Sequence, residues 1–234
     1  MVNIFIGDFY FNLKKLKKNV FFIKFKEPKF ANLHRNKKIL ILGSGPSLLI
    51  KKKEIIDFIK TNKPIIIGCN NIPNEFKIDY RIFTNRSRFA NYSNLVSQPQ
   101  KIILSPYFKK NFIKKYIYNK SFYYAFYKVQ RNLKQNFEID KNNIISFKIT
   151  PNVGFIAILV AYIMGGNNIS IAGIDGYWKN VNQHYYNEKN DPKSIEDLLE
   201  KDIYLSLLFN DIIKFFKNKN ISFNSITKSK YNSN

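Results

Sequence analysis

A buried strand that ends in a glycine-rich turn constrains this chain more than any other feature. The run Lys38–Leu42 is apolar after its first residue, and the turn Gly43–Ser47 follows with the sequence Gly-Ser-Gly-Pro-Ser. Two glycines let a ligand approach the backbone, and the serines supply hydroxyls, of which Ser47 could also cap a following helix. The turn therefore predicts a phosphate or nucleotide cradle, although it is neither a Walker loop nor a complete dinucleotide fingerprint. A tight turn without a ligand stays the alternative.

Strands and helices are expected to alternate along the chain from residue 38 onward. The further predicted strands are residues 64–68, 79–85, 101–105, 168–173 and 220–224, and the predicted helices are 51–60, 152–164 and 194–217. This alternation predicts an α/β fold with a Rossmann-like, doubly wound, mainly parallel sheet. Residues 107–147 show no clean periodicity, so that a lid or small acceptor-facing lobe and an irregular packed connection both stay open.

Polar residues follow four of the predicted strands directly. They are the turns Gly43–Ser47, Cys69–Asn71, Thr84–Arg88 and Asp175–Trp178. Because ligands of doubly wound sheets bind outside the carboxyl ends of the strands, we expect these four turns to converge on one crevice.

Amide side chains and a helix start supply candidate nucleotide-binding groups. Asn70 and Asn85 suit ribose hydroxyls or a base edge, with turn geometry as the alternative. Arg86 and Arg88 beside Asn85 favour an anionic ligand. The stretch Thr150–Gly154 begins the predicted buried helix, and free amides there suit a phosphate or carboxylate, with an ordinary helix start as the alternative.

An acid and a histidine lie beyond the strand at 168–173. Asp175 could bind a metal, sugar hydroxyls or a neighbouring loop, and no second carboxylate stands beside it to form a two-metal site. His184 could accept a proton from an attacking hydroxyl near neutral pH, with an incidental surface histidine as the alternative. His34 is interpreted as having no functional role. Cys69, the only cysteine, is expected to be a buried structural thiol, which fits a reducing compartment.

The formal net charge of +23 favours anionic partners. No zinc spacing, recognition helix or RNA-binding signature supports nucleic acid as the partner. We expect a basic aromatic arm over residues 1–36 and one Rossmann-like domain over 37–234. In the arm, residues 10–26 interleave aromatic side chains with lysines, which is typical of a segment on an anionic membrane; a helix or hairpin packed on the domain is the alternative.

The location of the protein is also predicted from its apolar runs. No apolar run reaches the roughly 20 residues that span a bilayer, and the N-terminus lacks the organisation of a signal peptide. We therefore expect a cytoplasmic protein, and peripheral contact of its arm with the inner membrane stays open.

Five motifs in this order resemble a known family. They are Gly43–Leu48, Cys69-Asn70, Phe83–Asn85, Ile149–Gly154 and Gly173–Tyr177. The set is similar to the bacterial CMP-sialic-acid-dependent sialyltransferases of lipooligosaccharide synthesis. It also resembles the 6-hydroxymethylpterin-diphosphokinase-like domains of motility accessory factors and surface-glycan gene clusters. The similarity covers roughly residues 38–224.

The resemblance implies a glycosyltransferase with a GT-A-variant-like fold. Such an enzyme transfers a nonulosonate, for example sialic acid, from a CMP-sugar to a glycan or glycolipid acceptor of the cell surface. The implied mechanism inverts the anomeric carbon and needs no metal or other cofactor. The residues implied to bind the nucleotide are Gly43, Ser44, Gly45, Ser47, Asn70, Asn85, Thr150, Asn152, Gly154 and Asp175.

The resemblance also implies the catalytic groups. Tyr177 and Tyr185, or Tyr186 in its place, would assist the departing phosphate, and His184 would act as the base. Two other functions stay open: a diphosphotransferase that uses Mg-ATP and a pterin-like substrate, and a non-catalytic nucleotide- or glycan-binding protein. The turn Gly43–Ser47 lacks the lysine of a P-loop, which argues against ATP hydrolysis. Assembly into a homo-oligomer also stays open.

Overall fold

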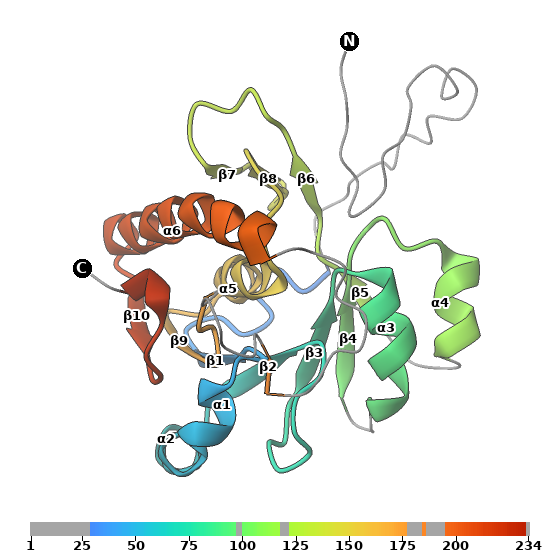
Figure 1. Cartoon of the computed structure of the whole chain (residues 1–234), viewed down its shortest axis with the longest axis vertical. Helices are drawn as coiled ribbons and strands as arrows, with labels where there is room; N and C mark the ends of the chain where they lie inside the picture. The colour runs from blue at the N-terminus through green and yellow to red at the C-terminus, as the bar shows by residue number, and fades with distance from the viewer. Residues whose placement is uncertain (1–28, 97–99, 118–121, 177–183, 186–194, 233–234) are drawn as a thin grey trace.

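The computed structural model describes residues 29–96, 100–117, 122–176, 184–185 and 195–232 (Figure 1). Its central sheet has seven strands in the order β10-β9-β1-β2-β3-β4-β5, and every neighbouring pair is parallel. The predicted α/β fold with a parallel, Rossmann-like sheet is therefore confirmed. The strands are β1 (Lys38–Leu42), β2 (Ile65–Cys69), β3 (Tyr80–Phe83), β4 (Lys101–Leu104), β5 (Phe122–Tyr124), β9 (Asn168–Ala172) and β10 (Ser222–Ser225).

Helices cover both faces of this sheet. Alternate residues of a strand point to opposite faces. Thus Ile39 and Ile41 of β1 pack into the cluster that includes α5 and α6, whereas Leu40 and Leu42 pack into the cluster that includes Ile55 of α2. The helices are α1 (Ser47–Ile50), α2 (Lys52–Asn62), α3 (Arg86–Tyr92), α4 (Lys110–Tyr116), α5 (Val153–Ile163) and α6 (Ile195–Asn218), with 3-10 turns at Ser93–Leu95 and Lys230–Asn232.

The strand order reverses beside β1. The chain runs from β1 through β2, β3 and β4 to β5 on one side, and it returns to β9 and β10 on the other side (Figure 1). The register pairs Leu42 of β1 with both Gly68 of β2 and Ala172 of β9, so these three strands end at nearly the same level. In open α/β sheets, ligands bind outside the carboxyl ends of the strands at such a reversal.

The stretch 107–147 contains regular elements that its sequence did not reveal. It holds α4, the edge strand β5 and a second sheet with the order β6-β8-β7. Tyr127, Phe137 and Phe147 of this sheet are buried in the same apolar cluster as α5, so the small sheet packs on the main domain. Its strands are β6 (Tyr127–Val129), β7 (Phe137–Ile139) and β8 (Ile145–Phe147), each of three residues.

Residues 29–36, the described part of the predicted arm, pack against the end of α5. Backbone N–H groups of Asn32, His34 and Asn36 donate to carbonyl groups at and just beyond the end of α5 over 2.7 to 2.8 Å. The Phe30 side chain is fully buried. This part of the arm is therefore bound to the core, whereas residues 10–26, the predicted membrane segment, lie outside the described residues.

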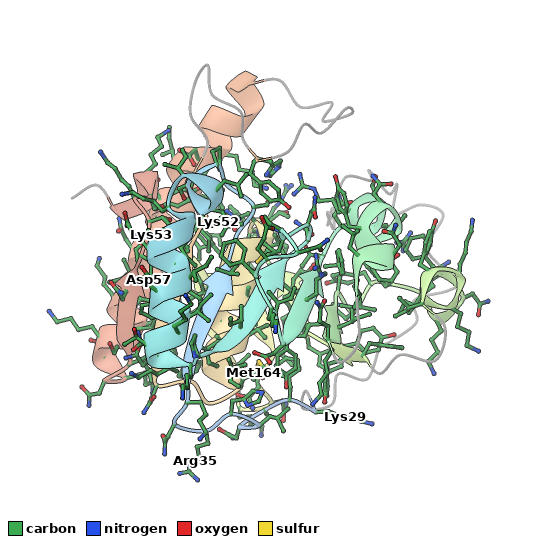
Figure 2. The ribbon with its side chains drawn as sticks, turned by 90° about the horizontal axis from the view of Figure 1, so that it is seen from below. Lys29, Arg35, Lys52, Lys53, Asp57 and Met164 are labelled. Atoms are coloured by element: carbon green, nitrogen blue, oxygen red, sulfur yellow. The ribbon has the colours of Figure 1, made fainter. Side chains whose placement is uncertain are left out.

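Figure 2 shows where this packed segment lies relative to the ends of the strands. Lys29, Arg35 and Met164 are at one end of the molecule, and Lys52, at the start of α2, is at the other. Since α2 follows the carboxyl end of β1, residues 29–36 lie at the edge opposite the four polar turns. None of the helices placed by the structure combines the length and the apolar character that crossing a bilayer requires.

Candidate functional site

The four polar turns occupy neighbouring positions at one edge of the sheet. They follow β9, β1, β2 and β3, which are consecutive in the strand order. The turns are therefore neighbours at one edge, as expected for the residues that the structure places, and the crevice between them stays a prediction. Tyr177 and Trp178, in the turn after β9, lie outside them, as does Tyr186.

The turn after β1 packs directly on the turn after β9. Gly43 N–H donates to Ala172 O over 2.7 Å, and Gly45 N–H donates to Gly173 O over 2.8 Å. A Cβ atom on Gly43 would lie 2.2 Å from Gly173 O, and one on Gly45 would lie 2.6 Å from the carboxyl group of Asp175. The space that these two glycines leave open is thus occupied by the turn after β9. Contact of the two glycines with a ligand stays a prediction.

Asp175 binds the start of α1. Its Oδ2 accepts from Ser47 N–H over 2.8 Å, and its Oδ1 accepts from the Ser47 hydroxyl. The expectation that Ser47 caps this helix is wrong, because Pro46 precedes the first turn and no side chain of α1 caps it. Burial raises the pKa of Asp175, and the hydrogen bonds from Ser47 oppose that rise. The sequence predicted a metal, sugar hydroxyls or a neighbouring loop as the partner of Asp175, and the structure shows contact with the neighbouring loop.

His184 joins the turn after β1 to helix α3. Its Nδ1 lies 3.1 Å from Ser44 Oγ, and its Nε2 lies 3.1 Å from Arg88 Nη2. The next residue is held by the same serine, because Tyr185 N–H donates to Ser44 O over 3.0 Å. Ser44 is itself buried. Both ring nitrogens of His184 therefore contact polar groups of the edge, and its role as a base stays a prediction.

The side-chain oxygens of two predicted asparagines cap helices. Asn85 Oδ1 accepts from Arg88 N–H at the start of α3, and Asn152 Oδ1 accepts from Phe155 N–H at the start of α5. Helix capping thus accounts for the positions of these two side-chain oxygens. Contacts of the two asparagines with a ribose or phosphate stay predictions.

The beginning of α5 lies beside the turn after β9. A Cβ atom on Gly154 would lie 3.1 Å from Ile174 Cδ1, so these two segments are in contact. Pro151 precedes the capping residue of α5. Thr150 is exposed just before this start. The stretch Thr150–Gly154 therefore adjoins the edge at the point where the sheet order reverses.

A buried arginine beside Asn70 is the feature that the sequence analysis missed. Arg81 in β3 is 2% exposed, and its Nη1 donates to Asn70 O over 2.7 Å. Asn70 is 1% exposed and has a φ of 55°, which suits asparagine in a turn. In the described part of the chain, Asn70 Oδ1 and Arg81 Nε have no hydrogen-bond partner, an uncommon state for buried polar atoms. The available signal was a charged residue inside the apolar strand 79–85.

Burial also changes the acidity of groups at this edge. It lowers the pKa of Arg81 to about 10 and raises the pKa of Tyr185 to about 12, the latter rise being opposed by the charge of Arg81. The ring of Tyr185 packs against the apolar cluster that includes α2. A phenol with this pKa keeps its proton at neutral pH, so that it can donate a hydrogen bond.

Cys69 is expected to be chemically inert in the folded protein. It is 1% exposed, and burial raises its pKa to about 12, so the reactive thiolate is scarce at pH 8. A thiol reagent such as Ellman's reagent should leave the native protein unmodified and should react with one thiol per chain in denaturant. Modification of the native protein as fast as the denatured one would contradict this placement. The interpretation of Cys69 as a buried thiol is confirmed by its exposure.

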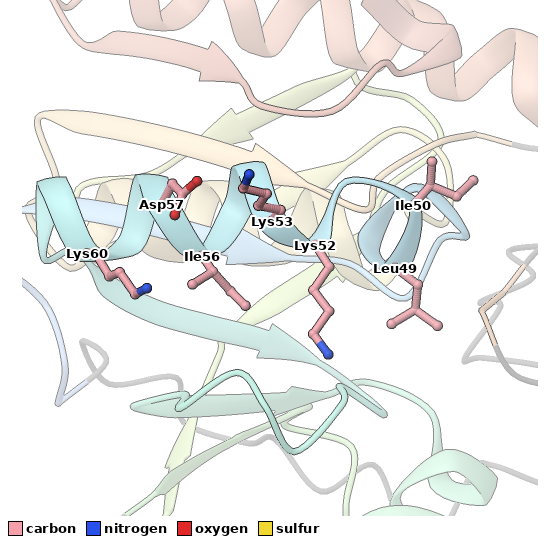
Figure 3. A pocket seen from close by; sticks show the side chains of 7 residues that line it. All are labelled: Leu49, Ile50, Lys52, Lys53, Ile56, Asp57 and Lys60. Carbon is pink, nitrogen blue, oxygen red and sulfur yellow. The ribbon is translucent and has the colours of Figure 1, made fainter.

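A hollow on the outer surface of α1 and α2 contains none of the candidate site residues at the edge of the sheet (Figure 3). It is lined by Leu49, Ile50, Lys52, Lys53, Ile56, Asp57 and Lys60. Asp57 is the one carboxylate in this set and no histidine, serine or cysteine accompanies it, so we assign no chemistry to this surface. Among the residues that the structure describes, no three His, Cys, Asp or Glu side chains lie close enough to hold a metal ion.

The fold is similar to that of a known glycosyltransferase. The sialyltransferase CstII from Campylobacter jejuni, solved in complex with the substrate analogue cytidine-5'-monophosphate, matches with a TM-score of 0.50 and 18% sequence identity. The match covers 82% of this chain and 81% of that chain. No protein-family model matches the chain, and no curated protein matches it. The likeness shows a shared α/β fold, and the pterin-diphosphokinase-like part of the resemblance finds no support.

Proposed function

We propose that this chain is a glycosyltransferase that takes a nonulosonate, such as sialic acid, from a CMP-activated donor. The observation that carries the proposal is the contact of His184 with Ser44 at the edge where the strand order reverses. In the proposal, this imidazole is the proton acceptor beside the predicted nucleotide cradle. The likeness of the fold to a sialyltransferase solved with CMP supports the same donor.

The proposed reaction uses His184 as the base. Its imidazole accepts the proton of an acceptor hydroxyl while that oxygen bonds to the anomeric carbon of the sugar. The bond from this carbon to the phosphate oxygen breaks on the opposite face, and CMP leaves with the electron pair. The configuration of the anomeric carbon is therefore inverted.

The departing phosphate needs stabilisation, which hydroxyl donors can give without a metal. Tyr185 keeps its proton because burial raises its pKa to about 12. It is our candidate donor in the described part of the chain, and Tyr177 is the second candidate. The proposed nucleotide contacts are the glycine-rich turn, Asn70, Asn85, Asp175 and the start of α5.

The proposal includes the acceptor and the place of action. We propose a surface glycan or glycolipid as the acceptor and a cytoplasmic enzyme that meets it at the inner membrane. The basic segment 10–26 would provide the membrane contact, and the net charge of +23 suits an anionic lipid surface.

A nucleotide screen by thermal shift tests the proposal. We expect CMP and CDP to raise the melting temperature without Mg²⁺, whereas UDP, GDP and ATP have little effect. At a ligand concentration of about 100 times Kd, the stabilisation should be about 2.7 kcal/mol, or about 5 to 10 °C for a chain of this size.

The other outcomes separate the alternatives. Stabilisation by Mg-ATP alone would contradict the proposal and favour a diphosphotransferase. Stabilisation by CMP, without transfer of sugar from CMP-sialic acid to a panel of glycans or to water, would favour a non-catalytic binding protein. No stabilisation by any of the five nucleotides would contradict a nucleotide-dependent function altogether.

A further inference from the structure

His184 is held between side chains from two distant parts of the sequence. Ser44 Oγ lies 3.1 Å from Nδ1, and Arg88 Nη2 lies 3.1 Å from Nε2. The imidazole therefore bridges the turn after β1 and the first turn of α3, with a partner at each ring nitrogen.

These partners determine which ring nitrogen carries the hydrogen. A guanidinium group has hydrogen-bond donors and no acceptor, so Nε2 must accept from Arg88. The ring is then neutral, and its hydrogen lies on Nδ1, where it can be donated to Ser44 Oγ. It follows that the lone pair of Nε2, at which the ring would accept a proton, points toward the guanidinium group of Arg88.

We infer that Arg88 is a positioning residue that covers the basic nitrogen of His184 until an anionic group of the ligand draws its guanidinium away. The inference rests on the proposed function, since the donor phosphate would be that anionic group. A guanidinium binds a phosphate through paired, charge-assisted hydrogen bonds, which are stronger than a hydrogen bond to a neutral imidazole. Exchange of the imidazole for the phosphate is therefore favourable.

The backbone of Arg88 is fixed at the start of helix α3. The Arg88 N–H donates to Asn85 Oδ1 over 3.1 Å, and the neighbouring Phe89 is fully buried against Phe83. The Arg88 side chain is half-buried. In the inference, a change of the Arg88 rotamer releases Nε2 of His184 while helix α3 stays in place.

A second cation, Arg81, should also strengthen the binding of an anion at this edge. Arg81 is buried beside Asn70 at the carboxyl end of β2 and has no carboxylate partner among the residues placed by the structure. The carboxylate of Asp175 accepts hydrogen bonds from Ser47 on both of its oxygens. A buried positive charge without a counter-ion attracts an anion strongly, because the dielectric constant around it is low.

Nuclear magnetic resonance of the two histidine rings tests this inference directly. The full chain, labelled with 15N at histidine, contains only His34 and His184, so two ring spectra are expected. Without ligand, His184 should show a protonated Nδ1 and an Nε2 shifted by an accepted hydrogen bond. The variant Arg88→Met should move this Nε2 resonance to the position of a free lone pair. The matched control Arg86→Met should not, because Arg86 donates to Tyr107 O over 3.0 Å instead.

Ligand addition supplies the decisive comparison. CMP, or inorganic phosphate at tens of millimolar, should move the Nε2 resonance of His184 in the wild type away from its ligand-free position. The same additions should leave it nearly unchanged in Arg88→Met. His34, which contacts the Tyr80 hydroxyl over 2.7 Å, serves as the reference for an intact fold in every sample.

The inference and the proposed function fail in different ways. If CMP binds, as other amide signals would show, while Nε2 of His184 stays at its ligand-free position, the inference about Arg88 is overturned and the proposed function stands. If CMP does not bind, the proposed function fails, and the phosphate titration alone decides the inference: a moved Nε2 resonance supports it, and an unmoved one overturns it.

Discussion

Replacement of Gly43 by alanine is expected to lower the free energy of unfolding by about 3 kcal/mol, the upper part of the usual range for overpacking. The added Cβ would lie 2.2 Å from Gly173 O and 2.7 Å from Gly173 C, both backbone atoms. Neither side can yield easily, because Gly43 N–H also donates to Ala172 O and β1 pairs with β9 along five residues. Thermal or urea unfolding would measure the loss, which corresponds to a fall of about 6 to 12 °C in melting temperature.

Gly154→Ala is the matched control for this experiment. A Cβ atom there would meet Ile174 Cδ1 at 3.1 Å, the far end of a flexible side chain, and Asn152 Oδ1 at 3.3 Å. Alanine also favours the helix over glycine by about 1 kcal/mol, so the net change in stability should stay within about 1 kcal/mol. A Gly43→Ala protein as stable as this control would mean that the two turns are not packed as closely as the structure shows.

The fold was predictable where the chain has long apolar runs. The strands at 38–42, 101–104 and 168–172 and the helix at 153–163 agree closely with the predicted ranges, because each is a continuous apolar run bounded by polar or turn residues, and its length separates strand from helix. Helix α3 was missed because only Phe89 of its seven residues is buried, so no apolar stripe appears. Strands of three residues, as in β5 to β8, are too short to show alternation.

At the candidate site, the sequence indicated which turns are neighbours but not the contacts between their residues. Since parallel strands end at one edge, the sequence already indicated which turns would be neighbours. It could not indicate that Gly45 packs on Asp175 or that Ser44 contacts His184, because these pairs are far apart in sequence and depend on the strand order. Arg81 was missed because a charged residue in an apolar strand is ordinarily an exposed one.

His184→Gln is expected to lower kcat for sugar transfer by about 10² to 10⁴-fold while the Kd for CMP changes little. Glutamine retains a hydrogen-bond donor and an acceptor for Ser44 and Arg88, but it has no nitrogen that can take a proton from a hydroxyl. The loss should therefore fall on the chemical step. Steady-state kinetics with a CMP-sugar donor, together with calorimetric titration of CMP, would measure the two effects separately.

His34→Gln is the matched control, because the chain has only these two histidines and His34 contacts Tyr80 from the segment 29–36, at the edge opposite the site. Its kcat should stay within about threefold of the wild type. A His184→Gln enzyme that binds CMP and keeps full transfer would remove His184 from the role of base. A variant that loses CMP binding and transfer together would instead assign His184 to donor binding through Ser44, and the base would then have to be sought on another residue of this edge.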